Sequence, residues 1–368
     1  MAAEPLDLAR LKVYPLAERK SLTRVTDILV DPQSVPGPCP AAVLKVIDDC
    51  VLKIRAARAR GAAVILIYGA HLLRNGAALV LERMMAGDFL THLATNGAGT
   101  IHDWEYAWQG ASTESVEQNV ATGSFGTWDE TSTNIHLALL AGALEGLGYG
   151  RSLGRLILED GATIPSLDTL ISAIVSEPES PLTGPRSEFL RAIRQRSWPA
   201  GRLAINHCWK ESSILAQAYR HGIPISVHPG IGYDIIANHP IFNGAVIGRA
   251  AELDFKLFGG SLQDLEGGVV LSIGSAIMGP QVFEKALSCV NNLRLQEGKE
   301  VVKGHTFYVV DLQDGGNWDW TAGEPPKSNP AYYLRFCKSY SRMGGTLNYS
   351  QCDNMTFLHH LHKRLSDS

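Results

Sequence analysis

Residues 62–68 read AAVILIY, and residues 69–76 continue as GAHLLRNG. A short, unbroken run of aliphatic side chains is typical of a strand that is buried on both faces of a parallel sheet. The glycine after it predicts a tight turn, and a helix is expected at residues 77–85. Before the run, apolar side chains recur at helical spacing through residues 41–60. This stretch therefore predicts the order helix, buried strand, turn and helix.

The same rhythm recurs along the chain. Further strands are predicted at residues 89–94, 203–206, 223–227, 269–273 and 307–311, and further helices at 211–220 and 281–294. Strands that alternate with helices form a parallel sheet with helices on both faces, so the predicted fold class is α/β. We divide the chain into an N-terminal arm, residues 1–40, whose second half is rich in proline, and a single α/β domain, residues 41–368.

The composition narrows the classes of partner. Of the 368 residues, 45% are hydrophobic and 19% are charged, and the formal net charge is −4. Without a strong positive field no nucleic-acid partner is expected, and no apolar window is long enough to predict a membrane span. The six dispersed cysteines and the charged N-terminus predict a cytoplasmic protein with reduced thiols. His207 and Cys208 have no third ligand at a recognisable spacing, so no metal is predicted.

Several predicted strands end in loops that contain glycine. Ligands of open α/β sheets bind at the carboxyl ends of the strands, where glycine allows close approach and helix N-termini can bind phosphate. The loops concerned are residues 69–76, 97–103, 228–234, 274–279 and 311–316. Neither G-x-G-x-x-G nor G-x-x-x-x-G-K-[ST] occurs. The alternative that these glycines serve only tight turns therefore stays open.

Four segments, in this order, resemble deoxyhypusine synthases. Residues 65–76, ILIYGAHLLRNG, resemble the strand and loop that open the NAD site of that family, and residues 95–99, TNGAG, resemble its Thr-Ala-Gly-Gly loop. Residues 210–225, KESSILAQAYRHGIPI, are similar to its Pro-Glu-Ser helix and the next strand. Residues 228–234, HPGIGYD, resemble its Asp-Gly-Ser-Leu-Gly-Asp loop. The resemblance extends over most of the chain.

The resemblance implies a Rossmann-like sheet that binds NAD, a homo-oligomer (dimer or tetramer), and transfer of an aminobutyl group from a polyamine through an imine. The residues that it places beside NAD are Gly69, Ala70, His71, Thr95, Gly97, Ala98 and Gly99. The remaining glycine loops add Gly230, Gly274, Ser275 and Asp311 to the predicted cofactor site. The resemblance also implies that Asp234 faces the amine, because a carboxylate is the natural partner of an ammonium group.

Two further sets of side chains are candidates for chemistry. The run His102-Asp103-Trp104-Glu105 follows a glycine loop and suits a His–carboxylate acid–base unit, for which His102 and Asp103 are the candidates; the alternative is a helix start whose acids complement the helix dipole. Trp318, Trp320 and Glu324 suit an amine substrate through cation–π and ionic contacts. The alternative is an interface loop that buries its tryptophans.

The chain departs from the family where the catalytic lysine would lie. The family has a Ser-Gly-Ala-Arg-Pro-Asp-Glu-Ala…Trp-Gly-Lys stretch, whereas residues 314–333 read DGGNWDWTAGEPPKSNPAYY. Lys327 lies nearby in a different context and is the candidate for the imine. Three hypotheses follow: an NAD-dependent aminoalkyl transferase that acts on a polyamine or another amine, an enzyme of the same fold with different chemistry, and a non-catalytic binding protein.

Overall fold

The central sheet of the protein is a six-stranded parallel sheet, seen in a computed structural model that describes residues 4–274 and 278–367. Its strands are β2 (Val64–Tyr68), β3 (His92–Asn96), β7 (Ile225–His228), β8 (Val269–Ile273), β9 (Thr306–Asp311) and β10 (Thr346–Gln351). They lie in the order β10-β9-β8-β2-β3-β7, and each neighbouring pair is parallel. Numbered along the chain, the order is 3-2-1-4-5-6, the arrangement of dinucleotide-binding Rossmann folds. The predicted α/β class is confirmed.

Successive residues of β2 pack into two different cores. Val64, Leu66 and Tyr68 belong to one hydrophobic cluster, and Ile65 and Ile67 to the other. Because neighbouring side chains of a strand point to opposite faces, a strand covered on both sides must be apolar at every position. This is the physical reason that the strand reads as an unbroken hydrophobic run.

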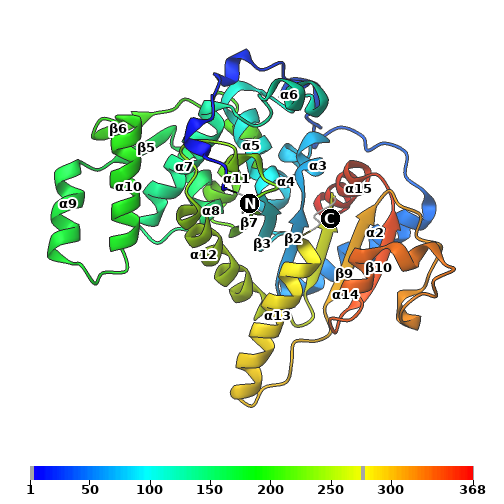
Figure 1. Ribbon diagram of the computed structural model, residues 1–368. Helices are drawn as coiled ribbons and strands as arrows, with labels where there is room; N and C mark the ends of the chain where they lie inside the picture. The colour runs from blue at the N-terminus through cyan, green and yellow to red at the C-terminus, as the bar shows by residue number, and fades with distance from the viewer. Residues whose placement is uncertain (1–3, 275–277, 368) are drawn as a thin grey trace.

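Helices cover both faces of the sheet (Figure 1). The first core is packed by α2 (Ala41–Ala59), α4 (Ala78–Ala86) and α15 (Asn354–Ser366). The second core is packed by the end of α12 (Gly244–Leu262), by α13 (Gly279–Gln296) and by α14 (Arg335–Tyr340). The predicted helices at 41–60, 77–85 and 281–294 correspond to α2, α4 and α13.

Between β3 and β7 the chain leaves the sheet and builds a helical extension (Figure 1). Its elements are α5 (Gly97–Gln109), β4 (Ala111–Ser112), α6 (Val116–Thr122), α7 (Asp129–Ala143), α8 (Tyr149–Leu158), β5 (Gly161–Ile164), α9 (Leu167–Ser176), α10 (Thr183–Arg196), β6 (Gly201–Ala204), the 3-10 turn η3 (Lys210–Ser212) and α11 (Ile214–His221). The prediction that the strand at 203–206 belongs to the parallel sheet is wrong. It falls on β6, which pairs antiparallel with β5 in a separate hairpin and is largely exposed.

The remaining elements are short. They are η1 (Leu8–Arg10), η2 (Leu16–Glu18), β1 (Thr23–Arg24), α1 (Val25–Ile28), α3 (Ala70–Arg74), η4 (Ile235–Ala237), η5 (Trp320–Ala322) and η6 (Pro330–Tyr333). The strand β10 was not predicted from sequence. It reads TLNYSQ and is only partly buried, because it closes one edge of the sheet and needs no continuous apolar run.

The N-terminal arm is packed onto the domain rather than detached from it. Its strand β1 pairs antiparallel with β4, and Leu16 and Val25 are buried. Gly76 adopts a φ of +83°, and a Cβ there would lie 1.8 Å from the carbonyl oxygen of Ile28. The arm therefore contributes buried contacts to the fold, while the division into arm and domain stays a prediction.

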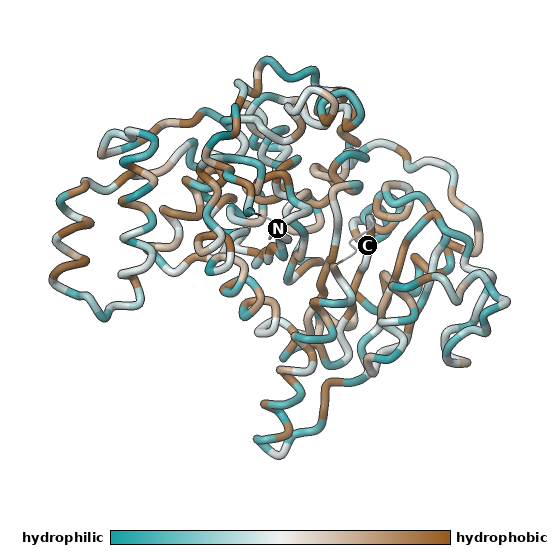
Figure 2. Tube along the Cα trace, in the orientation of Figure 1, coloured by the Kyte–Doolittle hydropathy of each residue, from teal (hydrophilic) through white to brown (hydrophobic). Residues whose placement is uncertain are grey.

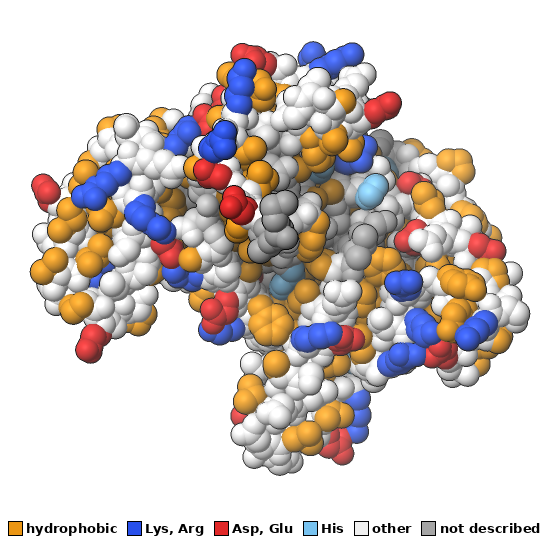
Figure 3. Space-filling model, viewed as in Figure 1, with side chains coloured by type: hydrophobic (Ala, Val, Ile, Leu, Met, Phe, Trp, Pro, Cys, Tyr) orange, Lys and Arg blue, Asp and Glu red, His pale blue; other side chains and the backbone are white. Residues whose placement is uncertain are grey.

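The helix α9 (Leu167–Ser176) is one of the exposed apolar features of the surface. Together with α10 it projects from the body of the molecule, and Figure 2 shows it as strongly hydrophobic. Leu167, Ile171 and Val175 are 36%, 37% and 74% exposed along one side of it. On the face shown in Figure 3, basic and acidic side chains are intermixed, in keeping with the small net charge. In the part of the chain that the structure describes, no helix is both long and apolar enough to cross a bilayer.

Buried histidines give the fold an expected sensitivity to acid. Burial lowers the pKa of His92 to about 3 and the pKa values of four others, His136, His207, His228 and His305, to about 4. In the unfolded chain their pKa is about 6.5, so below that pH the unfolded state binds more protons than the native state. We therefore expect the free energy of unfolding to fall as the pH is lowered from about 6.5 to about 4.

Three buried carboxyl groups work in the opposite direction. Burial raises the pKa of Asp103 and Asp234 to about 6 and that of Asp254 to about 7, so these groups favour the native state as the pH falls. The histidines outnumber them, and each aspartate also accepts backbone N–H groups that favour its charged form. Urea unfolding at pH 7, 5.5 and 4.5 measures the free energy of unfolding that results from the histidines and the aspartates together. A protein more stable at pH 4.5 than at pH 7 would contradict the expectation.

Candidate functional site

A buried carboxylate lies against the N-terminus of α5, at the carboxyl end of β3. The carboxylate of Asp234 accepts the N–H of Gly230 at 2.7 Å and the N–H of Ala98. A Cβ at Gly97 would lie 2.1 Å from Asp234 Oδ2. Glycine is therefore required at position 97 so that this carboxylate can reach the first turn of the helix. Residues 97–103, predicted as a loop, form the first turns of α5, and they meet the loop at 228–234 here.

The other residues of the TNGAG loop are also engaged within the protein. The side chain of Asn96 accepts the N–H of Gly99 at 2.9 Å and caps α5. A Cβ at Gly99 would lie 2.2 Å from Thr95 Oγ1, and Thr95 is fully buried. Amide groups that were predicted to face NAD thus bond to Asn96 and Asp234. At this helix start the glycines are explained by packing against protein side chains.

Asp234 borders a cavity of about 280 Å³, near the small end of the range for ligand pockets. The apolar part of its wall comes from Leu22, Ile101, Val116, Phe125 and Ile235, and the charged or ionisable side chains on it are Arg19, Arg74, His102, Glu105, Glu114, Tyr233 and Asp234. These residues come from the arm, from α3, from α5 and from the loops before α6, before α7 and after β7. The cavity therefore joins parts of the chain that lie far apart in sequence.

Most charges in this cavity are already paired. Arg19 and Glu105 form a bidentate ion pair, and Glu114 accepts the indole N–H of Trp128 at 3.0 Å. Asp234 is different, because it is 4% exposed and its Oδ1 has no hydrogen-bond partner among the described residues. Burial raises the pKa of Asp234 to about 6. A buried carboxylate oxygen without a donor is costly, and a donor from a ligand would satisfy it.

His102 lies on the wall of this cavity, whereas Asp103 points elsewhere. Asp103 is buried and accepts the hydroxyl of Ser213 at 2.5 Å and the N–H groups of Ile214 and Leu215 at 2.8 and 3.2 Å. It therefore caps the start of α11. Adjacent residues on a helix do not face each other, so the structure separates the two side chains that the sequence suggested as an acid–base unit.

The loops after β2 and β8 meet at the centre of the sheet. Gly274 has a φ of +87°, and a Cβ there would lie 3.1 Å from the Cβ of Leu72 in α3. Strands β3 and β7 lie on one side of β2, and the later strands β8, β9 and β10 lie on the other side. Such a switch point is where open α/β sheets bind dinucleotides. Gly69, Ala70 and His71 lie on one side of it; Ser275 lies outside the described residues.

The remaining predicted residues follow β9. Asp311 ends this strand, and its Oδ1 accepts the N–H of Leu312 at 2.6 Å. Trp320 is 6% exposed and belongs to the second core, while Trp318 donates its indole N–H to the carbonyl of Gly323 at 2.9 Å.

The charged residues of this loop are placed differently from one another. Glu324 forms ion pairs with Lys338 and Arg342, and Lys327 is exposed. The tryptophans and Glu324 are thus engaged in contacts within the protein.

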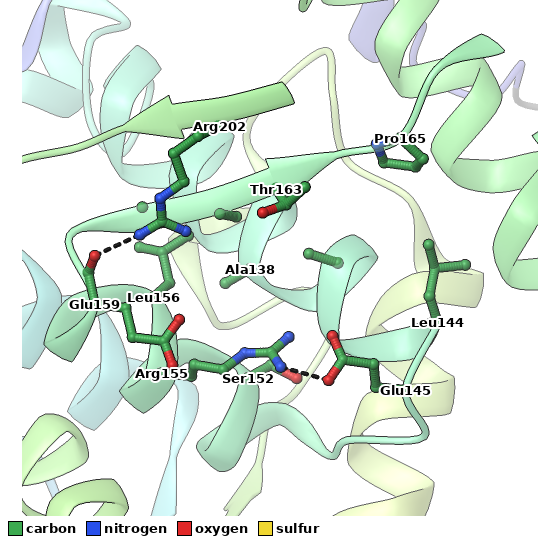
Figure 4. Close-up of a pocket in the computed structure, with 13 residues that line it drawn as sticks. Ala138, Leu144, Glu145, Ser152, Arg155, Leu156, Glu159, Thr163, Pro165 and Arg202 are labelled. Atoms are coloured by element: carbon green, nitrogen blue, oxygen red, sulfur yellow. Dashed lines mark hydrogen bonds and ion pairs between the residues drawn. The ribbon is translucent and has the colours of Figure 1, made fainter. Parts of the chain in front are cut away.

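A second cavity of similar volume lies beside the β5–β6 hairpin, away from the sheet edge (Figure 4). Its arginines are engaged: Arg155 pairs with Glu145 at 2.6 Å, and Arg202 donates to the carbonyl of Glu159. Over the described residues, no three His, Cys, Asp or Glu side chains are grouped so that they could hold a metal ion.

The fold and the site together define a class, α/β proteins with Rossmann strand order and a polar cavity at the carboxyl edge of the sheet. No family model and no curated protein sequence matches the chain. Among solved structures it is similar to a conserved LOR/SDH protein of Methanococcus maripaludis S2, at 14% identity and a TM-score of 0.44, over 91% of this chain and 71% of that one.

Parts of two longer proteins are also similar to most of this chain. One is ArgZ, an arginine dihydrolase of the cyanobacterial ornithine–ammonia cycle, at 13% identity and a TM-score of 0.41, over 88% of this chain and 32% of that one. The other is AgrE in complex with ornithine and NAD+, at 13% identity and a TM-score of 0.40, over 91% and 34%. The chain spans about a third of the length of these two. A likeness at this level carries no argument about function, which must rest on the site.

Proposed function

We propose that the protein is an NAD-dependent enzyme that oxidises a small amine in the cavity beside Asp234. The observation that carries the proposal is the buried carboxylate of Asp234, whose Oδ1 has no partner among the described residues and which borders a cavity at the carboxyl edge of a Rossmann-ordered sheet. An ammonium group is the natural donor to such an oxygen. Because water is excluded there, the contact between the ammonium group and Asp234 would hold the amine in one orientation.

The residues at the sheet switch point fit a dinucleotide. Gly69, Ala70 and His71 follow β2, and Gly274 lies against the start of α3 with a positive φ that favours glycine. These residues and Asp311 would hold NAD; Thr95, Gly97, Ala98, Gly99 and Gly230 would border it from the side of Asp234. Bound NAD+ supplies a hydride acceptor for the carbon that carries the amine.

The chain's own residues bind the amine and move its proton. The ammonium group gives one proton to a base on the cavity wall, and the remaining N–H groups donate to Asp234. With the nitrogen so held, loss of a hydride from the adjacent carbon to bound NAD+ would turn the C–N single bond into a C=N bond and give an iminium ion. Arg74 lines the same cavity with no ion-pair partner among the described residues, which favours an amine that also carries an anionic group.

In the fuller form of the proposal, which the resemblance to deoxyhypusine synthases implies, a second amine adds to the C=N carbon, the bond to the original nitrogen breaks, and that nitrogen leaves as an amine or ammonia. Lys327 is then the candidate acceptor, on an exposed loop beyond the carboxyl end of β9. Mass spectrometry of the protein after incubation with NAD+ and a polyamine tests this step, because an aminoalkyl adduct adds a fixed mass to Lys327. The same fold with other chemistry, a non-catalytic binding protein and the homo-oligomeric state remain separate hypotheses.

The proposal predicts two separable binding effects. NAD+ at a hundredfold excess over its dissociation constant should stabilise the protein by about 2.7 kcal/mol, seen as a rise in the melting temperature. Asp234→Asn should keep this stabilisation and lose most amine binding, because a charged hydrogen bond contributes about 1.5–3 kcal/mol. In the parent protein, amine affinity should rise as the pH is raised through about 6, where Asp234 ionises.

Calorimetry with NAD+ and with a panel of polyamines and amino acids checks both effects. Absence of any stabilisation by NAD+ would remove the cofactor from the proposal. Equal amine affinity in the parent protein and in Asp234→Asn would remove the carboxylate from the site.

A further inference from the structure

We propose that Ser112 and Glu105 are positioning residues that hold His102 as the proton acceptor of the cavity, with Nε2 as its basic atom. The inference rests on the proposed function for the identity of the substrate, but the protonation state of His102 can be measured without any substrate. Glu105 belongs to the His102–Glu105 run that suggests a His–carboxylate unit from the sequence, whereas Ser112 carries no sequence signal.

The three side chains form a continuous chain of hydrogen bonds. His102 Nδ1 lies 2.7 Å from Ser112 Oγ, and Ser112 Oγ lies 2.5 Å from Glu105 Oε2. The carboxylate of Glu105 also accepts two bonds from Arg19, at 2.7 and 2.8 Å. The chain of contacts therefore runs from the cavity wall to a buried ion pair.

The direction of each bond follows from the chemistry of its atoms. The carboxylate of Glu105, paired with Arg19, can only accept, so the single hydroxyl hydrogen of Ser112 is used on Glu105. Ser112 Oγ must then accept from His102, and the proton of the neutral imidazole must reside on Nδ1. The lone pair of the ring is left on Nε2, which has no partner among the described residues.

The hydrogen-bonded groups of Ser112, Glu105 and Arg19 are shielded from solvent. Glu105 and Ser112 are both 0% exposed, and the side chain of Arg19 is 1% exposed. Thr131 donates a further bond to Glu105 Oε1 at 3.0 Å, so both carboxylate oxygens are well satisfied. Hydrogen bonds in such an environment are strong and well oriented.

The elements that carry these residues explain why they meet. His102 and Glu105 are three residues apart on α5 and so share one face of the helix. Ser112 lies in β4, which is held by its pairing with β1 of the N-terminal arm, and Arg19 belongs to the same arm. The N-terminal arm therefore covers the cavity and also holds Ser112 and Arg19 in position.

The charged groups around His102 favour a neutral ring at rest. Burial lowers the pKa of His102; Glu105 acts against this effect, while Arg74, Arg19 and His71 act with it. A neutral ring can take a proton at Nε2 from a bound ammonium group. The N–H bond breaks, its electron pair stays on the substrate nitrogen, and the imidazolium that forms donates from Nδ1 through Ser112 to Glu105.

Long-range ¹H–¹⁵N correlation NMR of the histidine rings tests the inference, with the His102→Gln variant assigning the signal. We expect the parent protein at pH 7.5 to carry the ring proton of His102 on Nδ1. Ser112→Ala should lose this preference for one tautomer and lower the pKa of His102, and Ser112→Thr, which keeps the hydroxyl, should restore both. Thr131→Val is the matched control, since it removes another bond to Glu105 but leaves the path to His102 intact.

A ring proton on Nε2 in the parent protein would overturn the inference even if every variant failed to fold. So would a tautomer that is the same in Ser112→Ala as in the parent. Failure of the proposed function gives a different pattern, in which the tautomer is as expected but neither NAD+ nor an amine binds.

Discussion

Replacing Glu105 with alanine is expected to lower the free energy of unfolding by about 3–5 kcal/mol, because it leaves a buried arginine without its counter-ion. The side chains of Arg19 and Glu105 are each 1% exposed and form two bonds, at 2.7 and 2.8 Å. The variant also removes the acceptor for the hydroxyls of Ser112 and Thr131. The arm should detach from α5 together with the loss of stability.

The matched control is an exposed ion pair. Lys256 and Glu252 lie four residues apart on α12 and are 65% and 61% exposed, so solvent screens their attraction. Glu252→Ala should leave the urea midpoint nearly unchanged. A double replacement of Arg19 and Glu105 by apolar residues should recover part of the loss, since no charge is then left buried. A Glu105→Ala midpoint equal to that of Glu252→Ala would show that the buried pair contributes nothing.

Gly97→Ala is expected to destabilise the protein by about 2–4 kcal/mol and to weaken amine binding. The new Cβ would lie 2.1 Å from Oδ2 and 2.4 Å from Cγ of Asp234, so the carboxylate must move. The N–H groups of Ala98 and Gly230 then lose their acceptor, and α5 loses a charge that favours its N-terminus. Binding of NAD+ should change less than binding of the amine.

A second glycine supplies the control for this variant. Gly248, inside α12, has open space around its Cβ position, so Gly248→Ala should stabilise the protein by about 0.5–1 kcal/mol. Asp234→Ala removes the group that Gly97→Ala displaces. The double variant should therefore lose less stability than the sum of the two single variants. Strict additivity would mean that the two positions do not interact, and the account of the α5 N-terminus would fail.

Much of the fold could be predicted from the sequence, because burial on both faces leaves a local signal. The run at 62–68 is apolar throughout, and the run at 269–273 is apolar except for Ser272; each became a central strand, β2 or β8. Where the signal was weak, prediction failed. β10 is a half-exposed edge strand with a polar sequence, and β6 reads as a strand but pairs in a hairpin outside the sheet.

The site was predictable in part. Asp234 and the glycine at 97 were selected from separate loops, and the structure brings them into contact. His102 is linked through Ser112 to Glu105, three residues on along α5, whereas the adjacent Asp103 points to the start of α11. No sequence signal pointed to Ser112 or Arg19, since a lone serine and a lone arginine in an arm have no pattern to distinguish them.

The sequence by itself determined the α/β class, the central strands and the helices α2, α4 and α13, because these follow from periodicity and turn residues over a few positions. Only the tertiary structure decided the strand order, the hydrogen-bond partner of His102 and the groups that accept the amide N–H bonds at the start of α5. Those features depend on contacts between residues far apart along the chain. Two carboxylates of the same type, Asp103 and Asp234, read alike in sequence, yet one caps a helix inside the fold while the other also borders a cavity.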